Sequence, residues 1–339
     1  MFAVDDYKIE NINNISFIVI ARNEAFAVDK CLHAIFSMPL RNCEVITVDS
    51  DSSDRTLAVM KRYLNQHSIM KIFQCKGYIN AAVARNIGLN KAQKKYICFC
   101  DGDTEWNADF IQQAIKLMNS QEAIAVAGQL KEHIYSPDYN KIIKTQTRFP
   151  YPRKKNIYYC GGNFIVFKNY AHQAGSWDEG LVRNQDIDYT LRLSRIGPII
   201  GLPMIMGIHH TQSPVERTML FQKQGVAKYH GAVLRKNIDR PKILFDLLIS
   251  KNPGFIPGYI LYFALLLSLT ISFFNLRVAA FLFSSILGMI SLDLILGLSK
   301  GSSLQHRFLT HYCYPFFILI GLIKKSHPAK RITDVIQIT

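Results

Sequence analysis

The sequence lacks the cysteine patterns of a zinc protein or of a disulfide-stabilised protein. Its seven cysteines form no CxxC pair and no Cys/His cluster with the spacing of zinc ligands. We interpret them as the reduced thiols of a cytosolic protein. The first 14 residues lack the apolar segment of a secretory signal and contain Asp5, Asp6 and Glu10. We therefore expect the N-terminal part of the chain in the cytosol.

Motifs of nucleic-acid recognition are also missing. The formal net charge is +15, and basic side chains concentrate in residues 141–155 and 217–242. Neither stretch has a zinc-finger spacing, a helix-turn-helix pattern or an aromatic RNA-binding pattern. The second stretch runs almost to an apolar C-terminal region, which favours contact with anionic membrane lipids. We predict no nucleic-acid partner.

Charged side chains become rare from residue 255 onward. Residues 256–274 and 278–298 are each long and apolar enough to cross a bilayer as a helix, and the short connection between them predicts a helical hairpin. A buried pair of soluble helices is the alternative. Residues 308–323 contain His311 and Pro315, and a crossing there would place a basic tail outside, so we expect an interfacial or re-entrant helix. Asp293 should face protein, water or a lipid head group.

The N-terminal part of the chain has the pattern of an α/β domain. Residues 16–21, 44–48 and 96–100 are short apolar runs typical of buried strands. Helix-like stretches follow the first two runs, and residues 80–91 predict a third helix just before the last run. This alternation predicts parallel βαβ units. We therefore expect an α/β domain in residues 1–240 and a membrane-associated helical region in residues 241–339.

Two carboxylates flank a glycine directly after the strand of residues 96–100. Asp101 and Asp103, separated by Gly102, can face one cation from a single turn. Hard oxygen ligands of this kind suit Mn²⁺ or Mg²⁺. Because acidic turns are common, a solvated turn without a ligand is the alternative.

Several motifs in order resemble the family 2 glycosyltransferases, which have the GT-A fold, and the resemblance runs from Ser16 to about His210. VDSDSSDRT, residues 48–56, is similar to the second motif of the family, and YICFCDGD is similar to its metal-binding strand and turn. ARN-x-G, residues 84–88, is similar to the element that carries an arginine near the donor phosphates. The resemblance implies that a nucleotide-sugar is bound by Ala21, Asn23, Glu24, Asp49, Asp51, Arg85, Asp101 and Gly102.

The resemblance also implies an acceptor side and a base. Gly161, Gly162, Asn163, Trp177 and Gln185 correspond to the acceptor-side segments, and Asp186 corresponds to the general base of inverting members. A carboxylate there can take the proton of the acceptor hydroxyl. The alternatives are that Asp186 caps the following helix and that Trp177 is a core residue. The family has a glutamate where this chain has Gln185.

Two histidines follow an apolar segment at the position where many such enzymes place a histidine near the metal. We predict metal binding by Asp101, Asp103 and His210, with local packing of the His209–His210 pair as the alternative. The predicted activity is metal-dependent, inverting transfer from a nucleotide-diphosphate sugar, with UDP favoured, to a hydroxyl of a lipid-linked glycan or polysaccharide at the inner membrane face. A polyprenyl phosphate acceptor and a non-catalytic sugar-nucleotide-binding scaffold are the alternatives.

Overall fold

The computed structural model describes residues 12–77, 79–212, 226–250, 253–299, 304–323 and 334–338. Part of the predicted basic stretch 217–242, together with Lys300, Lys324, Lys325, Lys330 and Arg331, lies outside these ranges. The chain divides into two compact units, residues 1–213 with 328–339, and residues 214–327. The division lies before the predicted boundary at residue 240, because helix α8 (Lys228–Arg235) packs against helix α13 (Tyr314–Ile323) of the second unit.

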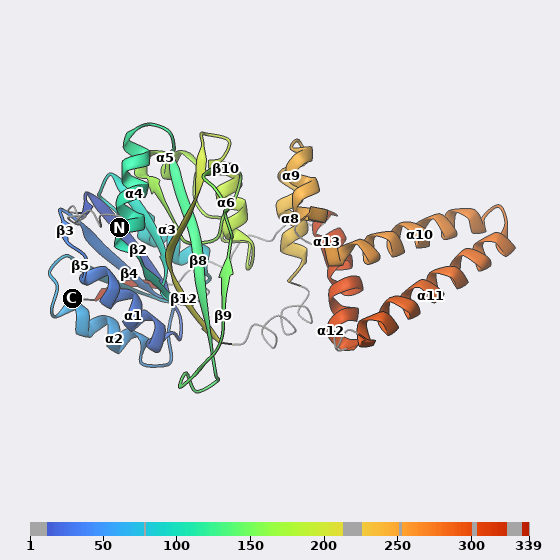
Figure 1. Ribbon diagram of the computed structural model, residues 1–339, viewed down its shortest axis with the longest axis horizontal. Helices are drawn as coiled ribbons and strands as arrows, with labels where there is room; N and C mark the ends of the chain where they lie inside the picture. The colour runs from blue at the N-terminus through green and yellow to red at the C-terminus, as the bar shows by residue number, and fades with distance from the viewer. Residues whose placement is uncertain are drawn as a thin grey trace, which may run out of the picture. The chain divides into compact units, whose positions relative to one another are not determined.

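The first unit alternates strands and helices as the sequence predicts (Figure 1). Its central part carries an additional hairpin and several short strands. The elements are β1 (Ile12–Asn13), β2 (Ile15–Ala21), α1 (Ala25–Phe36), β3 (Leu40–Arg41), β4 (Glu44–Asp49), α2 (Thr56–Leu64), β5 (Met70–Lys76), α3 (Ala81–Lys91), β6 (Tyr96–Asp101), β7 (Thr104–Trp106), α4 (Ala108–Asn119), β8 (Ala125–Tyr135), β9 (Ile142–Arg148), β10 (Lys155–Ile157), β11 (Phe164–Phe167), α5 (Lys168–Gln173), α6 (Gln185–Leu193), β12 (Ile199–Gln212) and β13 (Asp334–Ile338).

One mixed sheet forms the centre of this unit, with the strand order β10-β12-β8-β11-β6-β2-β4-β5-β13. The strands β6, β2, β4 and β5 are mutually parallel, as the βαβ pattern predicts. All seven residues of β2 are buried, because alternate side chains enter two different apolar clusters. A strand covered on both faces needs a continuous apolar run, and that is what residues 16–21 provide.

Helices cover both faces of the sheet. The side chains of α1, α2 and α4 join one cluster, and those of α3, α5 and α6 join the other. Helix α3 lies very close to β2, because Gly88 faces Ile18: a Cβ atom on Gly88 would be 2.2 Å from the Ile18 Cγ2 atom. The helix predicted for residues 80–91 is therefore held on the sheet by its small-residue face.

The C-terminal strand β13 lies at the edge of the same sheet. It pairs antiparallel with β5 from Asp334–Lys76 to Ile338–Ile72. The sequence analysis did not predict this strand. It brings the end of the chain back to the N-terminal unit.

The second unit is helical. It contains α8, α9 (Pro241–Phe245), α10 (Ile256–Ser272), α11 (Leu276–Ser299), α12 (Leu304–Phe308) and α13, with short turns at Asp246–Ser250, Pro253–Phe255 and Leu309–Cys313. Among the described residues, Leu276–Leu296 is long and apolar enough to cross a membrane, and α10 is a shorter apolar helix. Asp293 contacts protein: its carboxylate accepts hydrogen bonds from Arg307 at 2.6 Å and Tyr312 at 2.9 Å.

Candidate functional site

The predicted donor-side residues lie at the carboxyl ends of three neighbouring parallel strands. In the register of the sheet, Ala21 of β2 is opposite Asp49 of β4, and Ile20 is opposite Asp101 of β6. The chain leaves β2 toward β4 on one side and reaches β6 on the other, and open α/β sheets bind ligands at such a switch point. Asp49 is fully buried, and its Oδ2 atom accepts a hydrogen bond from the Ser52 amide at 3.2 Å. Its Oδ1 atom has no hydrogen-bond partner within the described ranges.

Two loops at these strand ends hold each other. The Asn23 amide donates to the Ser52 hydroxyl at 3.0 Å, and the Asn23 carboxamide oxygen accepts from the Ser53 amide at 2.8 Å. The Glu24 amide donates to the Thr56 hydroxyl at 2.8 Å. Asn23 has φ 54° and Asp51 has φ 56°, so both loops turn sharply through the left-handed region. These contacts fix the backbone around Asp49.

Asp101 is held from two directions. The Arg85 guanidinium contacts its Oδ1 atom at 2.5 Å, and the Asn163 side-chain amide donates to its Oδ2 atom at 3.0 Å. Asn163 also accepts from the Asp101 backbone amide at 2.8 Å. Gly162 allows this arrangement, because a Cβ atom there would be 2.2 Å from the Arg85 Nη2 atom and 2.9 Å from the Asp101 Oδ2 atom.

Helix α3 and the loop of residues 176–184 position Arg85. Its guanidinium lies 4.5 Å from the centre of the Trp177 ring, a cation–π contact. Asn86 donates to the Trp177 carbonyl at 3.0 Å and accepts from the Trp177 amide at 2.8 Å. Trp177 itself is only 1% exposed and stacks on Tyr189. It is a core residue that supports Arg85, so it offers no ring face to an acceptor sugar.

The second carboxylate of the turn contacts a histidine. The Asp103 Oδ2 atom is 3.0 Å from His209 Nε2, and Glu132 Oε1 is 3.0 Å from His209 Nδ1. Burial alone would lower the pKa of His209, but Asp103 and Glu132 outweigh it and raise that pKa to about 10. The hydrogen bond from His209, with further contacts from Gln146 and Arg148, lowers the pKa of Glu132 to about 2.

His210 faces the other way, since neighbouring side chains of a strand alternate between its faces. Its Nε2 atom is 3.0 Å from Glu105 and its Nδ1 atom is 3.0 Å from the Tyr135 hydroxyl. Burial lowers the pKa of His210. The imidazole that contacts the Asp101–Asp103 turn is therefore His209, whereas both ring nitrogens of the predicted ligand His210 have other partners.

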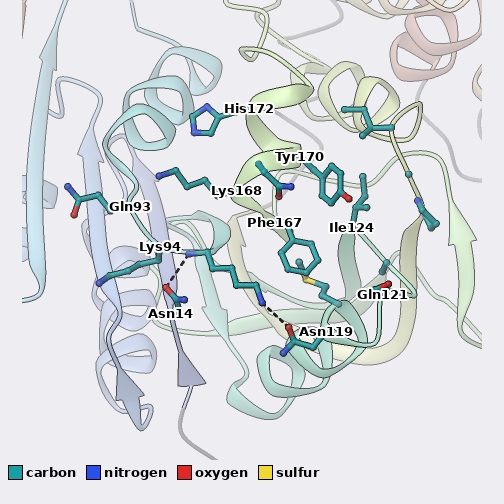
Figure 2. Close-up of a pocket in the computed structure, with 17 residues that line it drawn as sticks. Asn14, Gln93, Lys94, Asn119, Gln121, Ile124, Phe167, Lys168, Tyr170 and His172 are labelled. Carbon is teal, nitrogen blue, oxygen red and sulfur yellow. Dashed lines mark hydrogen bonds between the residues drawn. The ribbon is translucent and has the colours of Figure 1, made fainter.

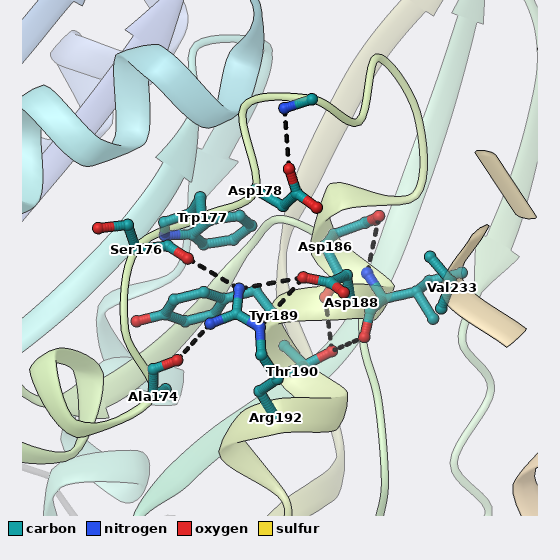
Figure 3. Close-up of polar contacts among 12 residues, drawn as sticks. Ala174, Ser176, Trp177, Asp178, Asp186, Asp188, Tyr189, Thr190, Arg192 and Val233 are labelled. Atoms are coloured by element: carbon teal, nitrogen blue, oxygen red, sulfur yellow. Dashed lines mark hydrogen bonds and ion pairs between the residues drawn. The ribbon is translucent and has the colours of Figure 1, made fainter. Parts of the chain in front are cut away.

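The predicted base lies at the start of helix α6 (Figure 3). Asp186 is half-buried and accepts a hydrogen bond from the Ile187 amide at 2.9 Å. Burial raises its pKa, and the positive charge of Arg85 opposes this effect. Gln185 beside it is buried and donates its side-chain amide to the Leu181 carbonyl. Gln185 thus holds the loop in front of α6.

Helix α6 is fixed by the pair Asp188–Arg192. Arg192 Nε donates to the buried Asp188 carboxylate at 3.1 Å, and Arg192 also donates to the Ala174 and Ser176 carbonyls (Figure 3). This network ties the helix to the segment before Trp177. Asp186 is thereby held on a rigid element.

The donor set suits a divalent cation that arrives with a phosphate ligand. Within the described ranges, no group of three or more His, Cys, Asp or Glu side chains is arranged to hold a metal ion. Asp103 and His209 supply one carboxylate and one imidazole, and Asp101 lies in the same turn. Mn²⁺ accepts such ligands, and cations of this class take substrate phosphate oxygens for the remainder.

The largest depression of the first unit lies elsewhere. It measures about 1140 Å³ and is lined by residues at the opposite ends of the strands, among them Lys94, Lys95, Lys168, Tyr170 and His172 (Figure 2). It contains none of the predicted site residues. The acidic edge at Asp49 and Asp101 therefore remains the candidate site.

The structure brings most predicted residues to this edge. Ala21, Asn23, Glu24, Asp49 and Asp51 form the two loops, Gly102 joins the carboxylates, and Arg85, Asn163 and Gly162 surround Asp101. Gly161 faces the ring of Phe149, which a Cβ atom on this glycine would meet at 3.3 Å. The sequence analysis missed Glu132 and Asn86. Only the second left a trace in the sequence, as the asparagine next to Arg85.

Comparison with known proteins gives the family. Residues 16–174 match the model of glycosyl transferase family 2. The amylovoran biosynthesis glycosyltransferase AmsB of Erwinia amylovora is 28% identical over 202 residues, which are 55% of this chain and 66% of that protein. A Methanococcus voltae dolichyl N-acetyl-alpha-D-glucosaminyl phosphate 3-beta-D-2,3-diacetamido-2,3-dideoxy-beta-D-glucuronosyltransferase is 25% identical over 249 residues, 66% of this chain and 75% of that protein.

The fold also matches a solved structure. A Pyrobaculum calidifontis mannosyltransferase in complex with GDP-Man and Mn²⁺ aligns with a TM-score of 0.59 at 16% identity, covering 91% of this chain and 87% of that protein. The chain spans 66%, 37% and 41% of the lengths of three curated relatives. The comparisons confirm the predicted GT-A fold and family. Residues 16–174 are a family 2 glycosyltransferase domain, and through it the chain belongs to that family of glycosyltransferases.

Proposed function

We propose that this chain transfers a sugar from a nucleoside diphosphate, with UDP favoured, to a hydroxyl of a lipid-linked glycan or polysaccharide, with inversion at the anomeric carbon. The observation that carries the proposal is the arrangement of Asp49, Asp101 with Arg85, and Asp186 around one end of the sheet. These groups separate three tasks: holding the base, holding the diphosphate and accepting a proton. The names of the relatives support the acceptor class, because one makes amylovoran and another acts on a dolichyl phosphate sugar.

The residues of this chain have distinct roles in the proposed reaction. Asp49, buried and with a free Oδ1 atom within the described ranges, accepts hydrogen bonds from the nucleobase. Arg85 pairs with diphosphate oxygens, for which a planar guanidinium is well shaped. Asp186 accepts the proton of the acceptor hydroxyl. Asp101, Asp103 and His209 would hold Mn²⁺ or Mg²⁺, which neutralises charge that develops on the departing diphosphate.

We further propose attachment to the inner membrane with the catalytic unit in the cytosol. The apolar helix Leu276–Leu296 and the shorter α10 support a hairpin in the bilayer, and the basic stretches support contact with anionic lipids. Extraction of the full chain from membranes should require detergent. Recovery in the soluble fraction without detergent would contradict this part of the proposal.

The test of the donor site is a calorimetric titration of the full chain with UDP-sugars and GDP-sugars, with and without Mn²⁺. We expect one donor to bind, with affinity lost in Asp103→Ala, because the second carboxylate of the turn is removed. Arg62→Gln, which breaks an exposed ion pair far from the strand ends, is the control. Absence of metal-dependent binding to every donor would favour the alternative of a non-catalytic scaffold.

A further inference from the structure

Both carboxylate oxygens of Asp101 are already engaged by protein groups. Arg85 occupies Oδ1 at 2.5 Å and Asn163 occupies Oδ2 at 3.0 Å. A cation approaching Asp101 therefore meets a guanidinium charge next to the oxygen it needs. The Asp103 carboxylate, in contrast, contacts His209 on the other side of the turn.

We propose that Arg85 acts as a latch on Asp101, so that a divalent cation gains Asp101 only when a diphosphate draws Arg85 away. The inference rests on the proposed function and adds an order to it: the cation and the nucleotide enter together. In the empty site, the latch keeps the metal affinity low. In the donor complex, the phosphate oxygens take the place of Asp101 as the partner of Arg85.

The surroundings of Arg85 favour such an exchange. Its side chain is only 7% exposed, so its charge is poorly hydrated and needs an anionic partner at all times. Asp101 is 30% exposed and can face a ligand from the solvent side. The Arg85 Nε atom is buried without a hydrogen-bond partner in the described part of the chain, so the pair with Asp101 leaves the guanidinium incompletely satisfied. A diphosphate offers more acceptor atoms than one carboxylate oxygen.

The latch implies that the metal and the nucleotide strengthen each other's binding. By linkage, the factor by which UDP or GDP raises the affinity for Mn²⁺ equals the factor by which Mn²⁺ raises the affinity for the nucleotide. Loss of the latch should raise the affinity for Mn²⁺ alone while it lowers the affinity for the nucleotide. A residue that only binds phosphate would change the second quantity and leave the first unchanged.

Two variants open the latch by different means. Arg85→Gln removes the charge that competes with the cation. Gly162→Ala keeps the charge but places a Cβ atom 2.2 Å from Arg85 Nη2, which forces the guanidinium away from Asp101. Arg62→Gln is the matched control, because it removes an arginine from the exposed pair with Asp29. Circular dichroism of each variant checks that it is folded.

The measurement is the free Mn²⁺ signal in electron paramagnetic resonance, titrated on the full chain in detergent with no nucleotide and then with UDP or GDP. We expect Arg85→Gln to bind Mn²⁺ alone about tenfold more tightly than the unaltered chain, Gly162→Ala to change in the same direction, and the control not to change. We also expect the nucleotide to enhance Mn²⁺ binding less in both variants.

Equal or weaker binding of Mn²⁺ alone in both variants, with nucleotide-enhanced Mn²⁺ binding intact in the unaltered chain, would overturn the latch and leave the proposed function in place. Failure of the unaltered chain to bind Mn²⁺ with any nucleotide would instead overturn the proposed function, and the latch with it.

Discussion

Asp186 combines the two properties that a general base needs, a fixed position and a pKa closer to neutral than that of an exposed aspartate. Its position comes from helix α6, which the Asp188–Arg192 pair ties to the preceding segment. Its pKa is raised by burial. A raised pKa makes the carboxylate a stronger proton acceptor once it is ionised.

Replacement of this carboxylate should therefore abolish most of the turnover. We expect Asp186→Asn to lower kcat by about 10²- to 10⁴-fold, while the affinity for the nucleotide-sugar stays within a small factor. Single-turnover rates and calorimetric donor affinities measure the two quantities. Asp138→Asn, in an exposed turn, serves as the control. Unchanged turnover in Asp186→Asn would refute the assignment of the base.

The raised pKa of Asp186 also fixes the sign of a pH effect. The base must be ionised, so kcat/KM should rise with pH through the pKa of Asp186, and this acid limb should lie above the ordinary range of an aspartate. Gln185→Glu adds a negative charge beside Asp186, which disfavours its ionisation and should move the limb to higher pH. It should also weaken the hold on Leu181, because an ionised glutamate cannot donate there. Profiles of kcat/KM against pH would show the shift; a limb that moves to lower pH would contradict the environment described for Asp186.

At the residue scale, motif order predicted Asp49, Arg85, Asp101 and Asp186 at one edge, and the structure places them there. The choice between His209 and His210 could not be made, because a strand turns neighbouring side chains to opposite faces and the sequence does not show which face meets the turn. Trp177 was equally ambiguous. A tryptophan serves a core or a sugar site with the same chemistry, and only its burial separates the two.

Helix α3 is the element on which the site depends most, because it carries Arg85 and Asn86 on one turn and meets the sheet through Gly88. Its N-terminus is capped by Asn80, whose side chain accepts from the Ala82 and Val83 amides and donates to the Glu179 carbonyl at 2.8 Å. The helix thereby links the sheet to the loop before α6. A shift of α3 would displace Arg85 and Trp177 together.

Enlargement of Gly88 tests this dependence. Gly88→Ala puts a Cβ atom 2.2 Å from Ile18 Cγ2, in the middle of a buried strand where a β-branched side chain cannot rotate away. We expect destabilisation by about 1–3 kcal/mol despite the better helix propensity of alanine. Thermal unfolding measures it. In a double-mutant cycle, Gly88→Ala should cost less in the background of Ile18→Ala; additive effects would mean that the two groups do not meet.

The elements predicted from the sequence are those whose pattern is strong without tertiary context. β2, β4 and β6 are buried on both faces and read as apolar runs. β5, β9 and β13 are less regular because they have exposed positions or lie at an edge, and all seven residues of β9 are at least partly exposed. β13 is formed by a segment whose pairing partner lies more than 250 residues away, at β5. No local pattern reveals such a partner.

At the scale of the whole molecule, the chain consists of an α/β unit and a helical unit, and its last strand belongs to the first of them. β13 covers the edge of β5, which would otherwise present unpaired backbone groups. Removal of residues 334–338 should lower the thermal stability of the α/β unit and promote self-association through β5. Light scattering in detergent, compared with Val335→Thr as a milder change, measures the association. A monomeric truncated chain of unchanged stability would show that the edge is tolerated uncovered.

The pairing of β13 with β5 also constrains the topology of the chain in a bilayer. Two strands that share backbone hydrogen bonds are on the same side of the membrane, so the polypeptide between them must cross the bilayer an even number of times. If α10 and α11 form one re-crossing pair, the segment of α13 adds no crossing of its own. In sealed inner-membrane vesicles with the cytosolic face outward, Gln337→Cys should react with a membrane-impermeant maleimide. Protection of that thiol until the vesicles are opened would give an odd count and turn α13 into a third span.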